Sequence, residues 1–114
     1  MSGDYSLEWQ RRGAITVGEV QAILAEHRDE LTAMGVAHLS VFGSVARGQA
    51  GPDSDVDLLV ELGRRMGYFE FFTVQERLEA LLGCPVDLST ANSLRDRVRP
   101  EVERERVDVW PLVA

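Results

Sequence analysis

Two short runs that favour β-strands limit this chain to a small fold built around a sheet. VAHLSVF, at residues 36–42, is rich in β-branched and aromatic side chains, and DVDLLVEL, at residues 55–62, is the second run. The connection between them ends in AGPDS, at residues 50–54, where Gly, Pro, Asp and Ser are grouped as they are in turns. This close spacing of strand, turn and strand favours antiparallel pairing.

A helix precedes the first strand. Thr16 followed by Glu19 has the form of a capping box, in which each side chain bonds the other residue's free backbone N–H. The residues after it place apolar side chains on one helical stripe: Val20, Ile23, Leu24, Leu31 and Met34. Gly35 lies where a helix C-terminal glycine belongs. We therefore predict one helix over residues 17–34.

The rest of the chain continues to alternate helix and strand. The predicted elements are a helical turn at 45–49, a helix at 68–82 closed by Gly83, a strand at 84–90, a helix from Asn92 or Ser93 to about 105 that Pro100 either kinks or restarts, and an edge strand at 106–110. This order predicts an α/β (α+β) fold, with a small mixed sheet of about four strands and helices packed on one face. We expect residues 16–114 to form this single domain and residues 1–15 to be an N-terminal extension.

The net charge argues against one large class of ligand. The chain of 114 residues carries a formal net charge of -7, and its basic run, RDRVR at residues 95–99, is interleaved with acid. Proteins that hold long nucleic acids by phosphate contacts show a basic face, so we expect no strong direct binding of DNA or RNA. A small anionic ligand bridged by a metal ion stays compatible with this charge, because the ion supplies the positive charge.

The sequence also restricts redox chemistry and location. Cys84 is the single cysteine, so an intramolecular disulfide and a CxxC site are excluded. No apolar run reaches the ~20 residues of a membrane-spanning helix, and the first residues, MSGDYSLEWQRRGA, lack the apolar core of a signal peptide. We therefore expect a cytoplasmic protein without a membrane partner.

Three Asp residues are the candidate catalytic groups. Asp55 and Asp57 share one face of the predicted strand, because residues two apart point the same way. Asp87 lies between Val86 and Leu88 in the third strand, and a neighbouring strand ~4.8 Å away would bring it beside the pair. Taken alone, Asp55 and Asp57 would be interpreted as solvated strand residues, with Asp87 unrelated to them.

Three carboxylates at one place would be costly without a cation. Like charges within a few ångströms raise one another's pKa and destabilise the fold, and divalent cations remove that cost. Oxygen ligands without His or Cys favour Mg²⁺ or Mn²⁺ over Zn²⁺. Two ions ~3.5–4 Å apart are the usual arrangement for phosphoryl displacement. Asp55, Asp57 and Asp87 are therefore candidate ligands for two Mg²⁺ ions.

A candidate phosphate-binding segment precedes the carboxylates. Gly43 follows a strand, where a glycine lets the backbone approach a ligand closely, and the amides after it can form an anion site. Ser44 adds a hydroxyl donor. The glycine spacing of GSVARG also matches a Walker A loop, but Gln49 and Ala50 stand where Lys and Ser or Thr are required. That alternative fails.

The combined pattern resembles a known signature. GS at residues 43–44, followed by DVD at 55–57, resembles the signature of the DNA polymerase β-like nucleotidyltransferase superfamily. The longer stretch FGSVARGQAGPDSDVDLLVEL, at 42–62, with a later VDL, is similar to the minimal nucleotidyltransferase (MNT) family. The resemblance implies the polymerase β-like nucleotidyltransferase fold over roughly residues 17–110. It also implies transfer of a nucleoside monophosphate from ATP or another NTP to a hydroxyl, with release of pyrophosphate.

Carried over by position, the resemblance implies a role for each candidate residue. The Gly-Ser pair at residues 43–44 would hold the β- and γ-phosphates, and Asp55 and Asp57 would coordinate both metal ions. Asp87 would be the third carboxylate, which binds the catalytic metal and helps to deprotonate the acceptor. No protein nucleophile is needed, because positioning and charge neutralisation dominate phosphoryl transfer. Arg47 has two interpretations: it reaches phosphate, or it packs against the acidic loop.

The resemblance also implies a partner. MNT-like chains are often encoded beside a HEPN-domain protein, with which they form toxin–antitoxin pairs. The chain is then expected to be an antitoxin that transfers AMP to a side chain of a HEPN toxin. One alternative is a catalytically weak binding module that neutralises the toxin by complex formation. A less favoured alternative is an antibiotic-modifying enzyme similar to aminoglycoside nucleotidyltransferases, which generally carry a further helical domain.

Overall fold

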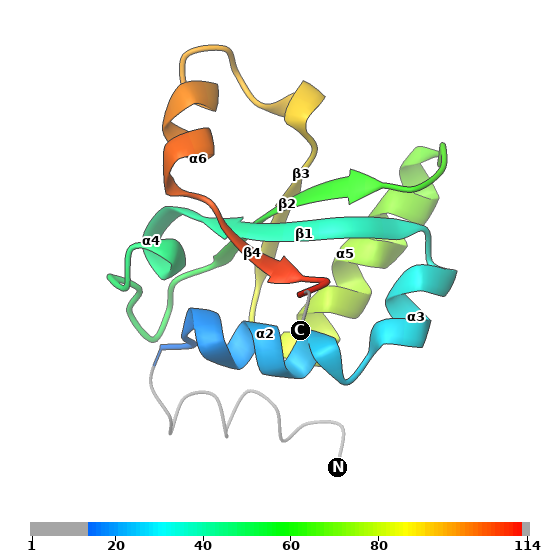
Figure 1. Cartoon of the computed structure of the whole chain (residues 1–114), viewed down its shortest axis with the longest axis horizontal. Helices are drawn as coiled ribbons and strands as arrows, with labels where there is room; N and C mark the ends of the chain where they lie inside the picture. The colour runs from blue at the N-terminus through cyan, green and yellow to red at the C-terminus, as the bar shows by residue number, and fades with distance from the viewer. Residues whose placement is uncertain (1–13, 113–114) are drawn as a thin grey trace.

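The computed structural model describes residues 14–112, which form a sheet flanked by helices (Figure 1). The helices are α2 (Val17–Ala25), α3 (Arg28–Ala33), α4 (Gly43–Ala46), α5 (Tyr68–Leu82), the 3₁₀ helix η1 (Ala91–Ser93) and α6 (Arg99–Glu105). The strands are β1 (Val36–Phe42), β2 (Val56–Leu62), β3 (Val86–Ser89) and β4 (Val107–Trp110).

The sheet is mixed and has the strand order β3-β2-β1-β4. β1 pairs antiparallel with β2 and with β4, whereas β2 pairs parallel with β3. The predicted antiparallel pair around the turn at residues 50–54 is therefore confirmed, as is the mixed sheet. β4 lies at one edge, as predicted, and β3 lies at the other.

The hydrophobic core lies between one face of the sheet and helices α2, α3 and α5 (Figure 1). The strands contribute alternate residues, which are Leu39, Val41, Val56, Leu58 and Val60. The helices contribute Val20, Leu24, Leu31, Val74, Leu78 and Leu82. Because these positions of β2 face the core, the residues between them, including Asp57, face the opposite side.

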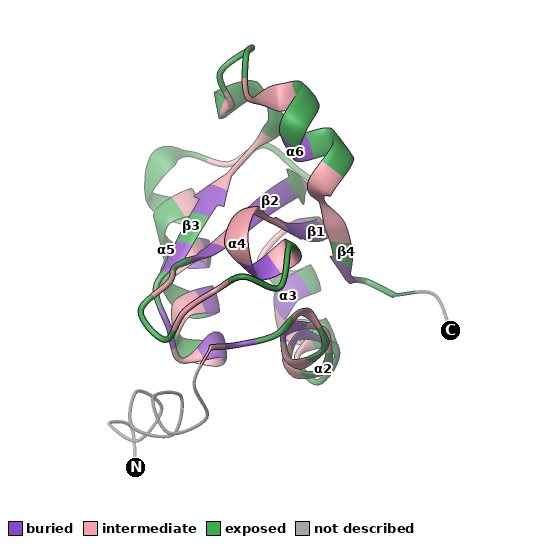
Figure 2. Ribbon diagram, turned by 90° about the vertical axis from the view of Figure 1, so that its left-hand side faces the viewer, coloured by how far each residue is buried: buried purple, intermediate pink, exposed green. Residues whose placement is uncertain are grey.

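The opposite face of the sheet is covered in part by the chain that joins β3 to β4. Leu59 and Ser40 are register partners on this face, and both are buried. η1 contacts β2, and α6 lies above this face with Val102 buried (Figures 1 and 2). We call residues 91–105 the arch. Helices α2, α3 and α5 lie on one face as predicted, and the structure adds the arch, with η1 and α6, on the other.

The predicted helix over residues 17–34 is wrong as a single element, because it is two helices. α2 ends at Ala25, and α3 begins after His27, whose backbone angles (φ -116°, ψ 31°) are not helical. The apolar stripe has no large apolar residue between Leu24 and Leu31. No side chain in this interval therefore anchors a continuous helix to the sheet, and the chain changes direction there.

Other boundaries lie close to the predictions. The capping box is present, and the Glu19 amide donates to Thr16 Oγ1 at 3.1 Å. α5 spans the predicted residues 68–82 and ends at Gly83, which is left-handed (φ 72°). The predicted start of the last helix at Asn92 or Ser93 is wrong, because residues 91–93 form the separate helix η1 and α6 begins only at Arg99. Pro100 lies in the first turn of α6, so it restarts a helix rather than kinking a longer one.

The predicted extension falls mostly outside the described residues, because residues 1–13 are not among them. Ile15, which the prediction placed in the extension, is buried and belongs to the core. Within residues 14–112, no helix is long and apolar enough to cross a membrane.

Candidate active site

Parallel pairing brings two of the candidate carboxylates together. Asp57 of β2 and Asp87 of β3 are register partners, and the residues flanking each of them are buried. Asp55 immediately precedes β2 and is exposed. Asp87 therefore lies beside Asp57, as predicted, whereas Asp55 lies just outside the strand in which it was predicted. The roles of the three residues stay predictions.

The carboxylates affect one another electrostatically. The pKa of Asp57 is raised to about 6, mainly by burial and then by the negative charges of Asp87 and Asp55, while the positive charge of Arg47 acts in the opposite direction. The charged form of Asp57 is thus disfavoured by both its surroundings and its neighbours. A raised carboxylate pKa beside like charges is typical of a site that holds a cation or a proton.

Gly43 is required by the position of Asp57. Its φ is 73°, a conformation that favours glycine, and a Cβ built on it would lie 2.3 Å from Asp57 Oδ2. The contact follows from the register, because Phe42, the preceding residue, pairs with Asp57. The sequence predicts that the missing side chain of Gly43 leaves room for a ligand, and the structure shows that it also leaves room for the Asp57 carboxylate.

Ser44 lies in the short helix α4, which begins at Gly43 rather than at the predicted residue 45. Its carbonyl accepts a hydrogen bond from the Gln49 amide at 2.9 Å, which closes the segment back on itself. The Ser44 hydroxyl forms no hydrogen bond to any residue from 14 to 112, and the residue is half-buried. This hydroxyl can therefore donate to a ligand.

Arg47 contacts the arch as well as its own loop. Its Nη1 lies 3.0 Å from Glu105 Oε1, and its Nε donates to Gln49 Oε1 at 3.0 Å. Sequence reasoning missed Glu105, which is 58 residues away along the chain. Of the two interpretations of Arg47, packing against acid is observed, with α6 rather than the turn supplying the carboxylate.

Comparison of the sequence with models of known protein families assigns this chain to a family. Residues 24–109 match the family model of the nucleotidyltransferase domain, which covers most of the chain. The chain belongs to this family. The resemblance drawn from the Gly-Ser and DVD pattern is thereby confirmed, and the protein is a nucleotidyltransferase.

Individual relatives agree with this assignment. The protein adenylyltransferase MntA of Thermococcus cleftensis is 43% identical over 96 residues, which cover 83% of this nucleotidyltransferase and 97% of the relative. A solved minimal nucleotidyltransferase superposes with a TM-score of 0.69 at 34% identity, covering 86% of this chain and 97% of that chain. A complex of a tri-AMPylated Shewanella oneidensis HEPN toxin with an MNT antitoxin contains a chain of the same fold, with a TM-score of 0.58 and 17% identity, covering 82% of this chain and 73% of that chain.

The side chains of this nucleotidyltransferase fit a hard divalent cation in their chemistry. Asp55, Asp57 and Asp87 offer only oxygen donors, which Mg²⁺ and Mn²⁺ prefer. In the described part of the chain, no three His, Cys, Asp or Glu side chains already surround a common point. The observation that supports a cation is the raised pKa of Asp57, because a bound positive charge would favour its ionised form.

Proposed function

We propose that this nucleotidyltransferase is an MNT-type antitoxin that transfers AMP from ATP to a side-chain hydroxyl of a HEPN-domain toxin. The observation that carries the chemistry is Asp57, whose charge is disfavoured beside Asp87 and Asp55 and whose carboxylate packs on Gly43. The Thermococcus relative, named a protein adenylyltransferase, supports AMP as the transferred group and a protein as the acceptor. The AMPylated HEPN toxin in the Shewanella complex supports the class of acceptor.

In this proposal, the acceptor oxygen attacks the α-phosphorus of ATP. The bond from that phosphorus to the bridging oxygen breaks, and pyrophosphate leaves with the electron pair. Asp87 lies on an edge strand and is exposed, so it can take the hydroxyl proton from an incoming acceptor. The Gly43–Ser44 segment would bind the β- and γ-phosphates, and Arg47 would offset their charge.

The proposal includes two Mg²⁺ ions, for which Mn²⁺ could substitute. Asp55 and Asp57 would hold both ions and Asp87 one of them, and the bound ions would neutralise the phosphate charge. Removal of divalent cations with EDTA should therefore abolish transfer, and added Mg²⁺ should restore it.

Intact-mass analysis of a co-expressed HEPN-domain partner tests the proposal. With the wild-type chain we expect the partner to gain the mass of one or more AMP groups, and with Asp57→Asn we expect no gain. Asp53→Asn is the matched control, because Asp53 lies in the exposed turn just before the site. The same mass gain with Asp57→Asn as with the wild type would contradict the assignment.

A second candidate function is neutralisation of the partner by binding alone. The first turns of α5 expose two aromatic side chains, Tyr68 (81% exposed) and Phe69 (85% exposed), and Phe72 is also exposed. Exposed aromatic groups are typical of interaction surfaces. α5 follows the end of β2, so these residues lie away from Asp57 at its start.

Suppression of toxicity in cells separates the two candidates. If Asp57→Asn still suppresses the toxin and Phe69→Ala does not, complex formation is sufficient. If Asp57→Asn loses suppression while it still binds the toxin, the enzymatic function is required.

A further inference from the structure

Two side chains from different parts of the chain hold the Arg47 guanidinium. Nε donates to Gln49 Oε1 and Nη1 donates to Glu105 Oε1, each at 3.0 Å. A guanidinium carries five N–H donors in one rigid plane, so two such bonds fix the orientation of the whole group. No residue from 14 to 112 accepts a hydrogen bond from Nη2. Its donors are therefore available to a bound ligand.

Arg47 is the C-cap residue of α4, and this helix holds it beside the strand that carries Asp57. α4, which contains the Gly-Ser pair, contacts both β2 and α6. Arg47 therefore lies between the carboxylates and the arch, beside the segment proposed to bind phosphate.

Glu105 occupies an electrostatically unfavourable place in its helix. It is the last residue of α6, and a helix C-terminus carries negative partial charge. A carboxylate there is stabilised only if a cation pairs with it, and Arg47 provides that cation. Glu103, in the same last turn, is more exposed and pairs with Arg106 only three residues further along.

We propose that Glu105 is a positioning residue for the nucleotide, which acts by holding the Arg47 guanidinium where it meets the triphosphate. The inference deepens the proposed function and rests on it. It also gives the arch a role, because the chain that leaves β3 after Asp87 returns at Glu105 to hold Arg47. One continuous segment thus joins the third carboxylate to the proposed phosphate contact.

Calorimetric binding of a non-hydrolysable ATP analogue with Mg²⁺ tests the proposal. Glu105→Gln keeps the size of the side chain and removes its charge, so we expect Kd to rise about tenfold through the loss of one charge-assisted contact. The KM for ATP should rise by a similar factor while kcat stays within about twofold. Glu103→Gln is the matched control and should bind like the wild type. A Kd for Glu105→Gln equal to that of the control would overturn the proposal.

A double variant separates positioning from a structural role. In an Arg47→Ala background, Glu105→Gln should change Kd no further, because Glu105 acts through Arg47. A second, additive loss of affinity would show that Glu105 acts elsewhere and would also overturn the proposal. Melting temperatures measured in parallel show that each variant is folded.

The test of the positioning role of Glu105 and the test of the proposed function can fail independently. If the wild type binds the analogue and Glu105→Gln binds it more weakly, but no AMP reaches the partner, the positioning role stands and the acceptor assignment fails. If AMP is transferred normally and Glu105→Gln binds like the control, the function stands and the positioning role fails.

Discussion

The antiparallel pair β1–β2 places a glycine of positive φ beside a charged side chain at each of its two ends. At one end Gly43 (φ 73°) faces Asp57, and a Cβ there would lie 2.3 Å from Oδ2. At the other end Gly35 (φ 90°) faces Arg64, and a Cβ would lie 3.1 Å from its Nε. The two ends share a backbone arrangement, and they differ in how the charge is compensated.

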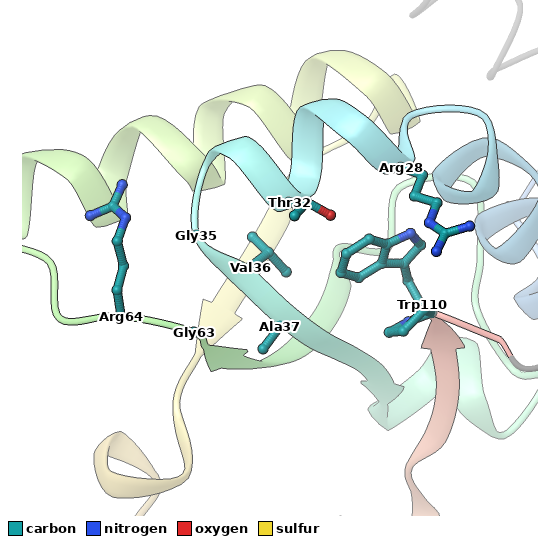
Figure 3. A pocket seen from close by; sticks show the side chains of 9 residues that line it. Arg28, Thr32, Gly35, Val36, Ala37, Gly63, Arg64 and Trp110 are labelled. Carbon is teal, nitrogen blue, oxygen red and sulfur yellow. The ribbon is translucent and has the colours of Figure 1, made fainter.

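Arg64 is paired, whereas Asp57 faces charges of its own sign. Arg64 Nη1 donates to Glu70 Oε2 at 2.9 Å, and its side chain lines a shallow pocket at the end of the sheet, across from Arg28 and Trp110 (Figure 3). Asp57 has Asp87 and Asp55 as neighbours, and its pKa is raised. A charged side chain packed against a glycine of positive φ is thus not by itself an indication of an active site. The like charges around Asp57 distinguish the end of the sheet that is proposed to be functional.

The largest effect is expected from removing the uncompensated charge. Asp57→Asn should reduce AMP transfer by about a thousandfold, because electrostatic stabilisation of the phosphates dominates this chemistry. Transfer of labelled AMP from ATP to the partner measures the loss.

The same variant should be more stable than the wild type at neutral pH without metal. Because folding raises the pKa of Asp57 from 3.8 to about 6, its destabilising effect is absent below pH ~4, grows between pH ~4 and 6, and is complete above that range. With allowance for solvent exposure, the gain for Asp57→Asn should be about 1–2 kcal/mol at pH 7 and close to zero at pH ~4. Equal stability at pH 7 would contradict the electrostatic account.

Gly43→Ala should have the next largest effect on transfer. The new Cβ must displace the Asp57 carboxylate, and a misplacement of about 1 Å can reduce a rate roughly a hundredfold. Gly48→Ala is the matched control, because Gly48 has a similar φ of 71° but open space around its Cβ position. Both variants should lose about 1–2 kcal/mol of folding free energy from the backbone conformation, and only Gly43→Ala should lose activity.

Gly35→Ala should affect stability alone. The positive φ and the contacts with Arg64 and Met66 predict a loss of about 1–2 kcal/mol in urea unfolding. The transfer rate per folded molecule should match the wild type, because this end of the sheet carries no proposed catalytic group. A loss of rate comparable to that of Gly43→Ala would show that the two ends are not functionally distinct.

Glu70→Gln should have the smallest effect. The hydrogen bond from Arg64 lowers the pKa of Glu70, so the pair stabilises the fold at neutral pH and loses that contribution as the pH falls through the lowered value. Because the pair is solvent-exposed, melting curves at pH 7 should show a slight decrease that disappears in high salt. At pH 3 the variant and the wild type should approach the same melting temperature.

Local patterns predict much of this fold. β1, β2 and α5 were predictable because apolar alternation and helical spacing are local properties, and Gly83 marks a helix end that depends only on its neighbours. The break at His27 was not predictable in this way, because it depends on where two short apolar stripes meet the sheet. The arch was missed for the same reason, since the contact of η1 with β2 is a tertiary property.

The candidate site shows the same division. Asp55 and Asp57 could be placed on one face by counting along a strand, and Asp87 could be placed beside them if the strands were neighbours. Two contacts could not be predicted from the sequence. The Asp57 carboxylate fills the space at Gly43, and Arg47 pairs with Glu105. Both depend on contacts between side chains from segments that only the folded chain brings together.

The strand order also constrains how the protein is made. β1 lies inside the sheet, yet its partner β4 is the last strand of the chain, and Leu39 pairs with Trp110. During synthesis one edge of β1 therefore stays unpaired until residues 107–110 have left the ribosome, and an unpaired edge can pair with another chain. A nascent chain in which β2 has emerged but β4 has not would therefore expose this edge of β1 to other chains, although the Asp residue of β2 is already in place.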